Sequence, residues 1–327
     1  RPEKWMFQSE PLLRSALDTR KFKHAGHTAD GQLRADVAFT GLRTLWFNTG
    51  SLCNVSCENC YIESSPRNDR LAYLTRDDVA FYLDELEGAA WQAEEVGFTG
   101  GEPFMNPDII AHLRDCLARG YRVLVLTNAM RPLLNHKAEL LALQAEFGAQ
   151  LVLRVSVDHY SAERHDVERG AGSWAPMMEG LLWLAQNGFH LSVAGRTRWQ
   201  ENEAELRAGY AALFARHEIA VDALNLEQLV LFPEMDATSD VAEITTACWG
   251  LLGVNPDSMM CANSRMVVRR KGAARSAVVA CTLLPYAAAF ELGETLSAAT
   301  SQPVSLNHPH CARFCVLGGG ACSASTP

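Results

Sequence analysis

The sequence predicts an α/β fold in which helices cover a parallel sheet, followed by a smaller cysteine-rich segment. Strand and helix patterns alternate from residue 44 to residue 232, polar residues follow the strands, and five of the ten cysteines fall within 261–322. Repeated strand–helix units are typical of a parallel sheet with its helices outside. The late cysteines indicate a second, smaller unit.

The first three predicted strands are each followed by a helix. Strand patterns cover 44–48, 96–99 and 122–127, and helix patterns cover 75–86, 106–119 and a stretch that ends near 148. Thr75 is the predicted N-cap of the first helix, and Asn106 with Pro107 behind it is the predicted start of the second. Gly120 ends that second helix.

Three more strands and two helices complete the alternation. The strands cover 150–157, 190–194 and 225–232, and the helices cover 174–187 and 202–216. Six strands connected in this way predict a parallel sheet whose carboxyl ends share one edge. Ligands bind at that edge in parallel α/β folds.

Composition and charge exclude several classes of protein. A chain of 327 residues with 48% hydrophobic and 20% charged residues is globular. Its net charge of −9 argues against nucleic acid or an anionic membrane surface as a partner. It has no apolar run of about 18 residues, the length that a membrane span requires. Because it does not open with a signal-peptide pattern, we expect a cytoplasmic protein.

A CxxxCxxC triplet of Cys53, Cys57 and Cys60 follows the first predicted strand. Cytosolic thiols stay reduced, so clustered cysteines indicate a metal site. Structural zinc ions and cuboidal iron–sulfur clusters normally take four ligands, so three close thiolates leave one metal position open. Taken alone, the triplet is also compatible with a zinc site completed by a distant histidine, or with a redox CxxC pair and a spare cysteine.

A second motif follows the second predicted strand, where Gly100, Gly101, Glu102 and Pro103 form a Gly-Gly-Glu-Pro turn. The glycines allow the backbone to approach a ligand closely, and Glu102 stands beside them. Together, this turn and the cysteine triplet resemble the radical S-adenosylmethionine (radical SAM) superfamily. The resemblance implies a partial (β/α)6 TIM-type barrel and a [4Fe–4S] cluster bound by the three cysteines. It also implies that SAM chelates the open iron and is cleaved to methionine and a 5′-deoxyadenosyl radical.

The same resemblance assigns residues to SAM. Tyr61 matches the aromatic residue that follows the third cysteine and packs near adenine, and the turn that begins at Gly100 matches the one that contacts the methionine amino group. Arg196 resembles a basic residue that fixes the SAM carboxylate. Arg198 is nearly as well placed, and a surface ion pair is an open alternative for either arginine.

Polar residues at the strand ends complete the predicted site. Asn128 follows 122–127, and it either contacts a ligand or simply begins a turn. Ser156 and Asp158 alternate with valines, so they face inward, where an unsatisfied polar group is costly. We expect them to bind the ribose hydroxyls of SAM. Glu227, predicted on the last strand, would join Arg196 and Arg198 in binding a zwitterionic or anionic substrate.

Cysteines also flank a predicted C-terminal β-hairpin, with Cys261 at its start, Cys281 at its end and Gly272 near its turn. A hairpin brings its ends together, so these cysteines can share one site with the later Cys311, Cys315 and Cys322. This pattern resembles the twitch or SPASM extension of radical SAM enzymes, which implies an auxiliary [4Fe–4S] cluster.

The ligands expected for that cluster are Cys261, Cys281, Cys322 and Cys315. Cys315 is preferred to Cys311 because it lies nearer the glycine run 318–320. A zinc site is the alternative. We expect Cys116 and Cys248 to be core residues. We expect His308 and His310, which flank Cys311, to be solvated, and the alternative is that they act as metal ligands or proton donors.

These observations divide the chain into an N-terminal extension (1–40), a radical SAM partial barrel (41–235) and an auxiliary-cluster domain (236–327). The resemblance implies an enzyme that abstracts hydrogen from a peptide or protein side chain or backbone, in an oxidation, thioether-forming or epimerising reaction. An electron donor such as flavodoxin or ferredoxin would serve it.

Two alternatives are a radical SAM dehydrogenase or cyclase acting on a small polar metabolite and, from another class, a non-catalytic iron–sulfur or zinc protein. The sequence names no catalytic acid or base. Tyr160, Glu227 and Asp236 are candidates by position alone.

Overall fold

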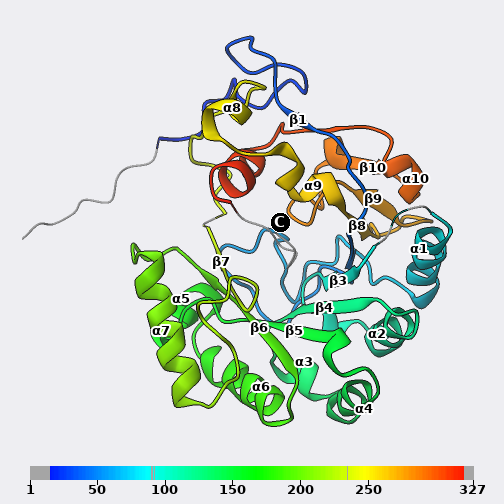
Figure 1. Cartoon of the computed structure of the whole chain (residues 1–327), viewed down its shortest axis with the longest axis vertical. Helices are drawn as coiled ribbons and strands as arrows, with labels where there is room; N and C mark the ends of the chain where they lie inside the picture. Colours follow the sequence, from blue (N-terminus) through cyan, green and yellow to red (C-terminus); the bar gives the residue numbers. More distant parts are fainter. Residues whose placement is uncertain (1–14, 90, 92, 234, 320–327) are drawn as a thin grey trace, which may run out of the picture.

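A nine-stranded sheet dominates the computed structural model, which describes residues 15–89, 91, 93–233 and 235–319 (Figure 1). The strand order is β10-β9-β8-β2-β3-β4-β5-β6-β7. Neighbouring strands from β8 through β7 pair in parallel, while β9 runs antiparallel to both of its neighbours, β8 and β10. The predicted α/β fold with a parallel sheet is confirmed.

The strands are short and mostly end where the sequence predicts. In the large sheet they are β2 (Thr44–Asn48), β3 (Glu95–Thr99), β4 (Arg122–Thr127), β5 (Leu151–Ser156), β6 (His190–Arg196), β7 (Leu229–Phe232), β8 (Ser264–Val268), β9 (Ala277–Val279) and β10 (Glu291–Gly293). A separate two-stranded sheet joins β1 (Asp36–Val37) to β11 (Val304–Ser305).

The last predicted strand begins too early, because Asn225 starts a turn instead. Its Oδ1 accepts hydrogen bonds from the N–H groups of Glu227 (2.8 Å) and Gln228 (3.3 Å). Asparagine side chains compete in this way with the hydrogen bonds of a sheet. The prediction that Glu227 and Gln228 lie on this strand is therefore wrong, and β7 begins at Leu229.

Helices cover the outer side of the parallel strands (Figure 1). The α-helices are α1 (Arg76–Gly88), α2 (Ile109–Ala118), α3 (Arg131–Leu134), α4 (Lys137–Phe147), α5 (Ala162–Arg169), α6 (Trp174–Gln186), α7 (Glu203–Arg216), α8 (Cys248–Leu252), α9 (Met260–Asn263) and α10 (Leu296–Ala299). Sequence patterns did not predict α3 or α5. Within the described part of the chain, none of the helices combines the length and the apolar content that a membrane crossing requires.

The second large helix starts later than predicted because the side chain of Asn106 does not cap it and instead bonds neighbouring loops. Its Oδ1 accepts a hydrogen bond from the N–H of Asp108 at 2.8 Å. Its Nδ2 donates to the carbonyls of Thr49 (3.1 Å) and Leu74 (2.9 Å). Asn106 therefore ties the start of α2 to the loop after β2, and the α-helix begins at Ile109.

The side chains of each strand divide between two apolar clusters. Phe47, Phe98 and Val155 are fully buried in the cluster that includes the covering helices. Trp46 points to the other face, where it is also fully buried. A Cβ at Gly97 on the neighbouring strand would lie 2.3 Å from the Trp46 ring, so only glycine leaves room for the indole. This packing holds β2 and β3 in register beneath the loops that follow them.

The predicted C-terminal hairpin is confirmed as β8 and β9, which pair antiparallel. Its first strand pairs in parallel with β2, so that Thr44 stands opposite Ser264. The large sheet is thus continuous across residue 235, where the sequence analysis places a domain boundary. The division into three units stays a prediction.

Candidate active site

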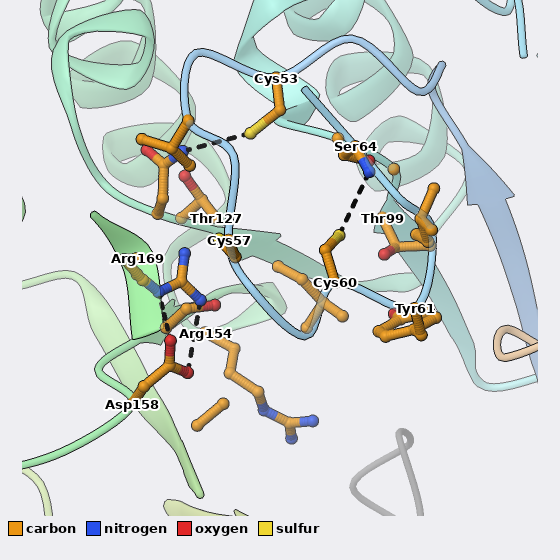
Figure 2. A pocket seen from close by; sticks show the side chains of 18 of the residues that line it. Cys53, Cys57, Cys60, Tyr61, Ser64, Thr99, Thr127, Arg154, Asp158 and Arg169 are labelled. Carbon is orange, nitrogen blue, oxygen red and sulfur yellow. Dashed lines mark hydrogen bonds and ion pairs between the residues drawn. The ribbon is translucent and has the colours of Figure 1, made fainter. Parts of the chain in front are cut away.

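Three thiols converge on one pocket at the carboxyl edge of the sheet. Cys53, Cys57 and Cys60 lie in the loop after β2 and line this pocket with residues from the ends of β3, β4, β5 and β6 (Figure 2). Seven of the predicted SAM contacts line it too: Tyr61, Gly100, Gly101, Asn128, Ser156, Asp158 and Arg196. The structure thus brings the cysteine triplet and the two glycines of the turn together at one edge of the sheet.

The glycine pair packs directly against the cysteine loop. The N–H of Gly101 donates to the carbonyl of Gly50 at 2.7 Å, and the N–H of Glu102 donates to that of Leu52 at 3.1 Å. A Cβ on Gly101 would lie 2.0 Å from the Leu52 carbonyl oxygen, and Gly100 has a φ of +142°. Glycine is therefore required here for the approach of the two loops, a reason that the sequence motif did not indicate.

Glu102 and Pro103 lie behind the pocket wall and not on its surface. Glu102 is buried, and its carboxylate accepts hydrogen bonds from the Thr127 hydroxyl (2.8 Å), the Asn128 N–H (2.8 Å) and the Phe104 N–H (3.2 Å). Burial raises the pKa of Glu102 to about 7, and these hydrogen bonds oppose the rise. This carboxylate joins the glycine turn to the end of β4.

Asn128 begins a turn, which is one of the two roles that the sequence left open, and its contact with a ligand stays a prediction. Its Oδ1 accepts from the N–H of Met130 at 3.0 Å, which begins the turn into α3. Its Nδ2 donates to Asn54 Oδ1 at 2.8 Å and lies 3.9 Å from Cys53 Sγ. Asn128 therefore shapes the turn and also contacts the cysteine loop.

Asp158 lies between two guanidinium groups, where we had expected it to face a ribose. Arg169 Nε is 2.6 Å from Asp158 Oδ2, and Arg196 Nε is 3.5 Å from Asp158 Oδ1 (Figure 2 shows the contact with Arg169). Burial acts to raise the pKa of Asp158, but the charges of Arg169 and Arg196 outweigh it, so that the pKa lies below its usual value. The carboxylate is therefore charged and orients both arginines.

Two arginines line the pocket that the sequence patterns did not predict there, Arg154 and Arg169. Arg169 ends α5, whose composition is too polar to show a helical pattern of apolar residues. Arg154 lies on β5 and is almost fully buried, with Nε 3.1 Å from Ser192 Oγ. Arg154 lies two residues before Ser156 and four before Asp158, so alternation along a strand places all three side chains on the same face. The pattern that predicted an inward position for Ser156 and Asp158 therefore also applies to Arg154.

The surroundings of Cys53 and Cys57 favour the protonated form of these two thiols. Burial raises the pKa of the Cys53 thiol to about 12, and the charge of Glu102 adds to this effect. Burial also raises the pKa of Cys57, while the charge of Arg169 opposes the rise. Because a metal binds the thiolate form, metal binding at this loop releases protons.

A family comparison agrees with the geometry of this pocket. Residues 47–197 match the model of the radical SAM superfamily. This segment is a radical SAM domain. It contains the cysteine loop, the glycine turn and the ends of β4, β5 and β6, so the expected family is confirmed for the part of the chain that carries the pocket.

Curated relatives of the radical SAM domain come from bacteria and an archaeon. The subtilosin biosynthesis protein AlbA of Bacillus subtilis is 29% identical over 143 residues, which cover 43% of this chain and 30% of AlbA. The mycofactocin maturase MftC of Mycobacterium ulcerans is 33% identical over 145 residues, covering 42% of this chain and 35% of MftC. The AdoMet-dependent heme synthase of Methanosarcina barkeri is 28% identical over 144 residues, covering 43% and 38%. The chain thus matches between 30% and 38% of the length of these relatives.

Solved structures share the fold over more of the chain. Streptococcus suis SuiB bound to S-adenosylmethionine superposes with a TM-score of 0.56 and 12% identity, covering 78% of this chain and 63% of SuiB. The protein anSMEcpe with bound AdoMet gives a TM-score of 0.57 and 13% identity, covering 80% of this chain and 78% of anSMEcpe. At this identity the likeness shows the TIM-barrel-like fold.

A second group of cysteines lies outside the matched segment. Cys261, Cys281, Cys311 and Cys315 line one pocket, with Cys311 and Cys315 on the π-helix Cys311–Val316. Such helical irregularities are frequent at functional sites. The predicted ligand Cys322 and the end of the glycine run lie outside the described residues. Among the described residues, no group of three or more His, Cys, Asp or Glu side chains is arranged to hold a single metal ion.

Residues near this second pocket correct two smaller expectations. His310 is buried, lines the pocket, and has no hydrogen-bond partner for its Nδ1 among the described residues, so the expectation of a solvated His310 is wrong. His308 is only partly exposed. Cys116 is a fully buried core residue as predicted, whereas Cys248 is half-buried at the start of α8.

The substrate group predicted from Arg196, Arg198 and Glu227 is not assembled. Glu227 lines a separate cavity with Arg122 and His190, at the amino ends of the strands. Arg198 instead bonds Glu58 and Glu168.

The three positional candidates for an acid or base are also absent from the radical SAM pocket as far as the described residues define it. Tyr160 donates its hydroxyl hydrogen bond to Glu201. The Asp236 carboxylate accepts from Ser239 and from the N–H of Thr238. Glu227 lies in the separate cavity at the other end of the strands.

Proposed function

We propose that this chain cleaves S-adenosylmethionine reductively and uses the resulting radical to abstract a hydrogen atom from a peptide or protein substrate. The observation that carries the proposal is the single pocket that combines three thiols, a glycine turn and the polar ends of four strands. An oxidation, thioether-forming or epimerising reaction would follow from this first step.

The residues of the pocket fit the group that the family implies. The cysteines would supply three thiolates to a [4Fe–4S] cluster and would leave one iron free, as a SAM-binding cluster requires. Among the residues that the structure describes, the lining of the pocket has three guanidinium groups, of Arg154, Arg169 and Arg196, and one carboxylate, of Asp158. This balance suits a bound cluster of negative charge and the carboxylate of SAM.

Each residue then has a defined task. Cys53, Cys57 and Cys60 would hold the cluster, and Tyr61, Gly100, Gly101, Asn128, Ser156 and Arg196 would bind SAM. Asp158 orients Arg169 and Arg196 toward the pocket, and the buried Glu102 holds the glycine turn against β4. When bound and reduced, the cluster supplies the electron that cleaves SAM to methionine and a 5′-deoxyadenosyl radical. The chain's own part is to orient SAM and to exclude water.

A peptide substrate is favoured by the names of two relatives, one a bacteriocin biosynthesis protein and the other a maturase. The relative named a heme synthase supports a second candidate, in which the substrate is a small polar metabolite that is dehydrogenated or cyclised. Deuterated substrates separate the two. Transfer of deuterium into 5′-deoxyadenosine from a peptide supports the first candidate, and transfer only from a metabolite supports the second.

The C-terminal cysteines extend the proposal to an auxiliary [4Fe–4S] cluster of the twitch or SPASM type. Cys261, Cys281, Cys311 and Cys315 share one pocket, so Cys311 is as well placed as Cys315 to be a ligand. Such a cluster would accept an electron from the product radical or bind the substrate. Flavodoxin or ferredoxin in the cytoplasm would reduce the first cluster.

Replacing Gly101 by alanine is expected to lower the iron content of the reconstituted protein by the share of one cluster, about four irons per chain. The added Cβ would lie 2.0 Å from the Leu52 carbonyl oxygen and would push the cysteine loop away from the turn. Gly26→Ala is the matched control, because a Cβ there meets no atom within 4 Å. Iron counting on both variants tests this, and full iron in Gly101→Ala would contradict it.

A further inference from the structure

The cysteine loop contains only bends and turns between Cys53 and Cys60, so contacts with other segments must fix its shape. Cys53 is held from one side, since its N–H donates to the Ser65 carbonyl at 3.1 Å. The turn between Cys57 and Cys60 consists of Glu58 and Asn59. Its contacts run to two segments that lie far away in the sequence.

The first of these segments is the end of α5, where Glu168 is fully buried. The Glu168 carbonyl accepts a hydrogen bond from the N–H of Glu58 at 2.9 Å. Its carboxylate Oε2 accepts one from Asn59 Nδ2 at 3.2 Å. A single residue therefore binds both members of the turn, through its main chain and through its side chain.

The second segment follows β6 and carries Arg196 and Arg198. Arg198 Nη1 lies 2.5 Å from Glu168 Oε2 and 3.0 Å from Glu58 Oε2, so it bridges the two carboxylates. Arg196 Nη2 lies 3.5 Å from the Asn59 carbonyl, and its Nε lies 3.8 Å from Glu168 Oε1. These five residues form what we call the Glu168 cluster.

The burial of Glu168 points to a role in position more than in stability. Taking a carboxylate out of water is costly, and buried ion pairs are often no more stabilising than apolar residues of similar size. Glu168 Oε1 also has no hydrogen-bond partner among the described residues. What the buried carboxylate does achieve is a fixed geometry, because it ties the turn to α5 and to the segment after β6.

We propose that Glu168 is a positioning residue of the radical SAM site, which sets the turn between Cys57 and Cys60 in the shape that binds the cluster. The proposal rests on the proposed function, in which these cysteines are cluster ligands. Arg196 lines the same pocket, so the Glu168 cluster also connects the cysteine turn to the surface that would face SAM.

Thiol labelling of the metal-free protein tests the position of the turn directly. In Glu168→Ala, the alkylation of Cys57 and Cys60 is expected to be about tenfold faster than in the wild type, because the turn opens locally. Buried Cys116 reports global unfolding and should label at the wild-type rate. Glu163→Ala is the matched control, since Glu163 is an exposed residue in the first turn of the same helix. Unchanged rates at Cys57 and Cys60 would overturn the proposal.

A milder variant covers the case in which Glu168→Ala does not fold. Arg198→Gln removes one partner of Glu168 from a partly exposed position and should accelerate the labelling of Cys57 and Cys60 in the same direction. If Arg198→Gln folds but labels like the wild type, the Glu168 cluster does not hold the turn.

The reconstituted protein gives the second readout. Glu168→Gln is expected to lose iron to a chelator several times faster than the wild type and to show a changed electron paramagnetic resonance spectrum of the reduced cluster on addition of SAM. A purely structural role would leave that spectrum unchanged, and this outcome would overturn the proposal. If the wild type binds no iron, the proposed function fails by itself, while the labelling result still decides the role of Glu168.

Discussion

Replacing Cys53, Cys57 and Cys60 together by alanine is expected to lower the iron of the reconstituted protein from about eight to about four per chain and to abolish 5′-deoxyadenosine formation. The three thiols line one pocket with the predicted SAM contacts, so their loss removes the only cluster that can bind SAM in the proposed arrangement. The auxiliary cluster should survive, because its proposed ligands line a different pocket.

Anaerobic reconstitution, iron counting and a dithionite-driven assay for 5′-deoxyadenosine measure this result. Cys248→Ala is a suitable control, because Cys248 is half-buried on α8 and its sulfur accepts a hydrogen bond from the N–H of Thr245 at 3.3 Å. Zinc in the wild type, or iron that never cleaves SAM, would favour the non-catalytic alternative over the enzyme.

Replacing Cys261 and Cys281 together by alanine is expected to give the opposite pattern. Iron should again fall to about four per chain, but 5′-deoxyadenosine should still form, since the first cluster is intact. Product formation from the substrate should be lost, because the auxiliary cluster would take the electron from the product radical or hold the substrate. The two variants together therefore separate SAM cleavage from the later step.

The uncoupled reaction is measured by comparing 5′-deoxyadenosine with modified substrate in the same sample. If the Cys261→Ala/Cys281→Ala variant keeps all of its iron, the second pocket is not a cluster site. Parallel loss of 5′-deoxyadenosine with normal folding would mean instead that the two sites depend on each other.

Sequence patterns predicted the strands that bear the site because those strands are mostly apolar and are followed by recognisable polar residues. Thr44–Asn48 and Arg122–Thr127 match the predicted limits. The failures came where a polar side chain bonds the backbone, as at Asn225 and Asn106. Local hydrogen bonds of this kind leave no periodic signal.

The contents of the pocket were predictable in part. The cysteine triplet and the glycine turn are short continuous segments, so the sequence alone predicted that they belong to the site. Arg169 comes from a short polar helix, and its partner Asp158 lies in the loop after β5, so only the folded chain shows the pair. The side chains that bond Glu168, such as Asn59 and Arg198, are likewise distant from it in the sequence.

The pairing of β2 with β8 has a consequence for biosynthesis. Thr44 hydrogen-bonds in register with the strand that begins at Ser264, so the ribosome must make most of the chain before that side of β2 is covered. Contacts between such distant segments slow folding, and an uncovered strand edge invites pairing with other chains. The cysteine loop directly follows β2. During synthesis its thiols therefore follow a strand that still lacks its partner β8. A metal inserted before the C-terminal hairpin has paired with β2 would bind to a partly folded, aggregation-prone intermediate.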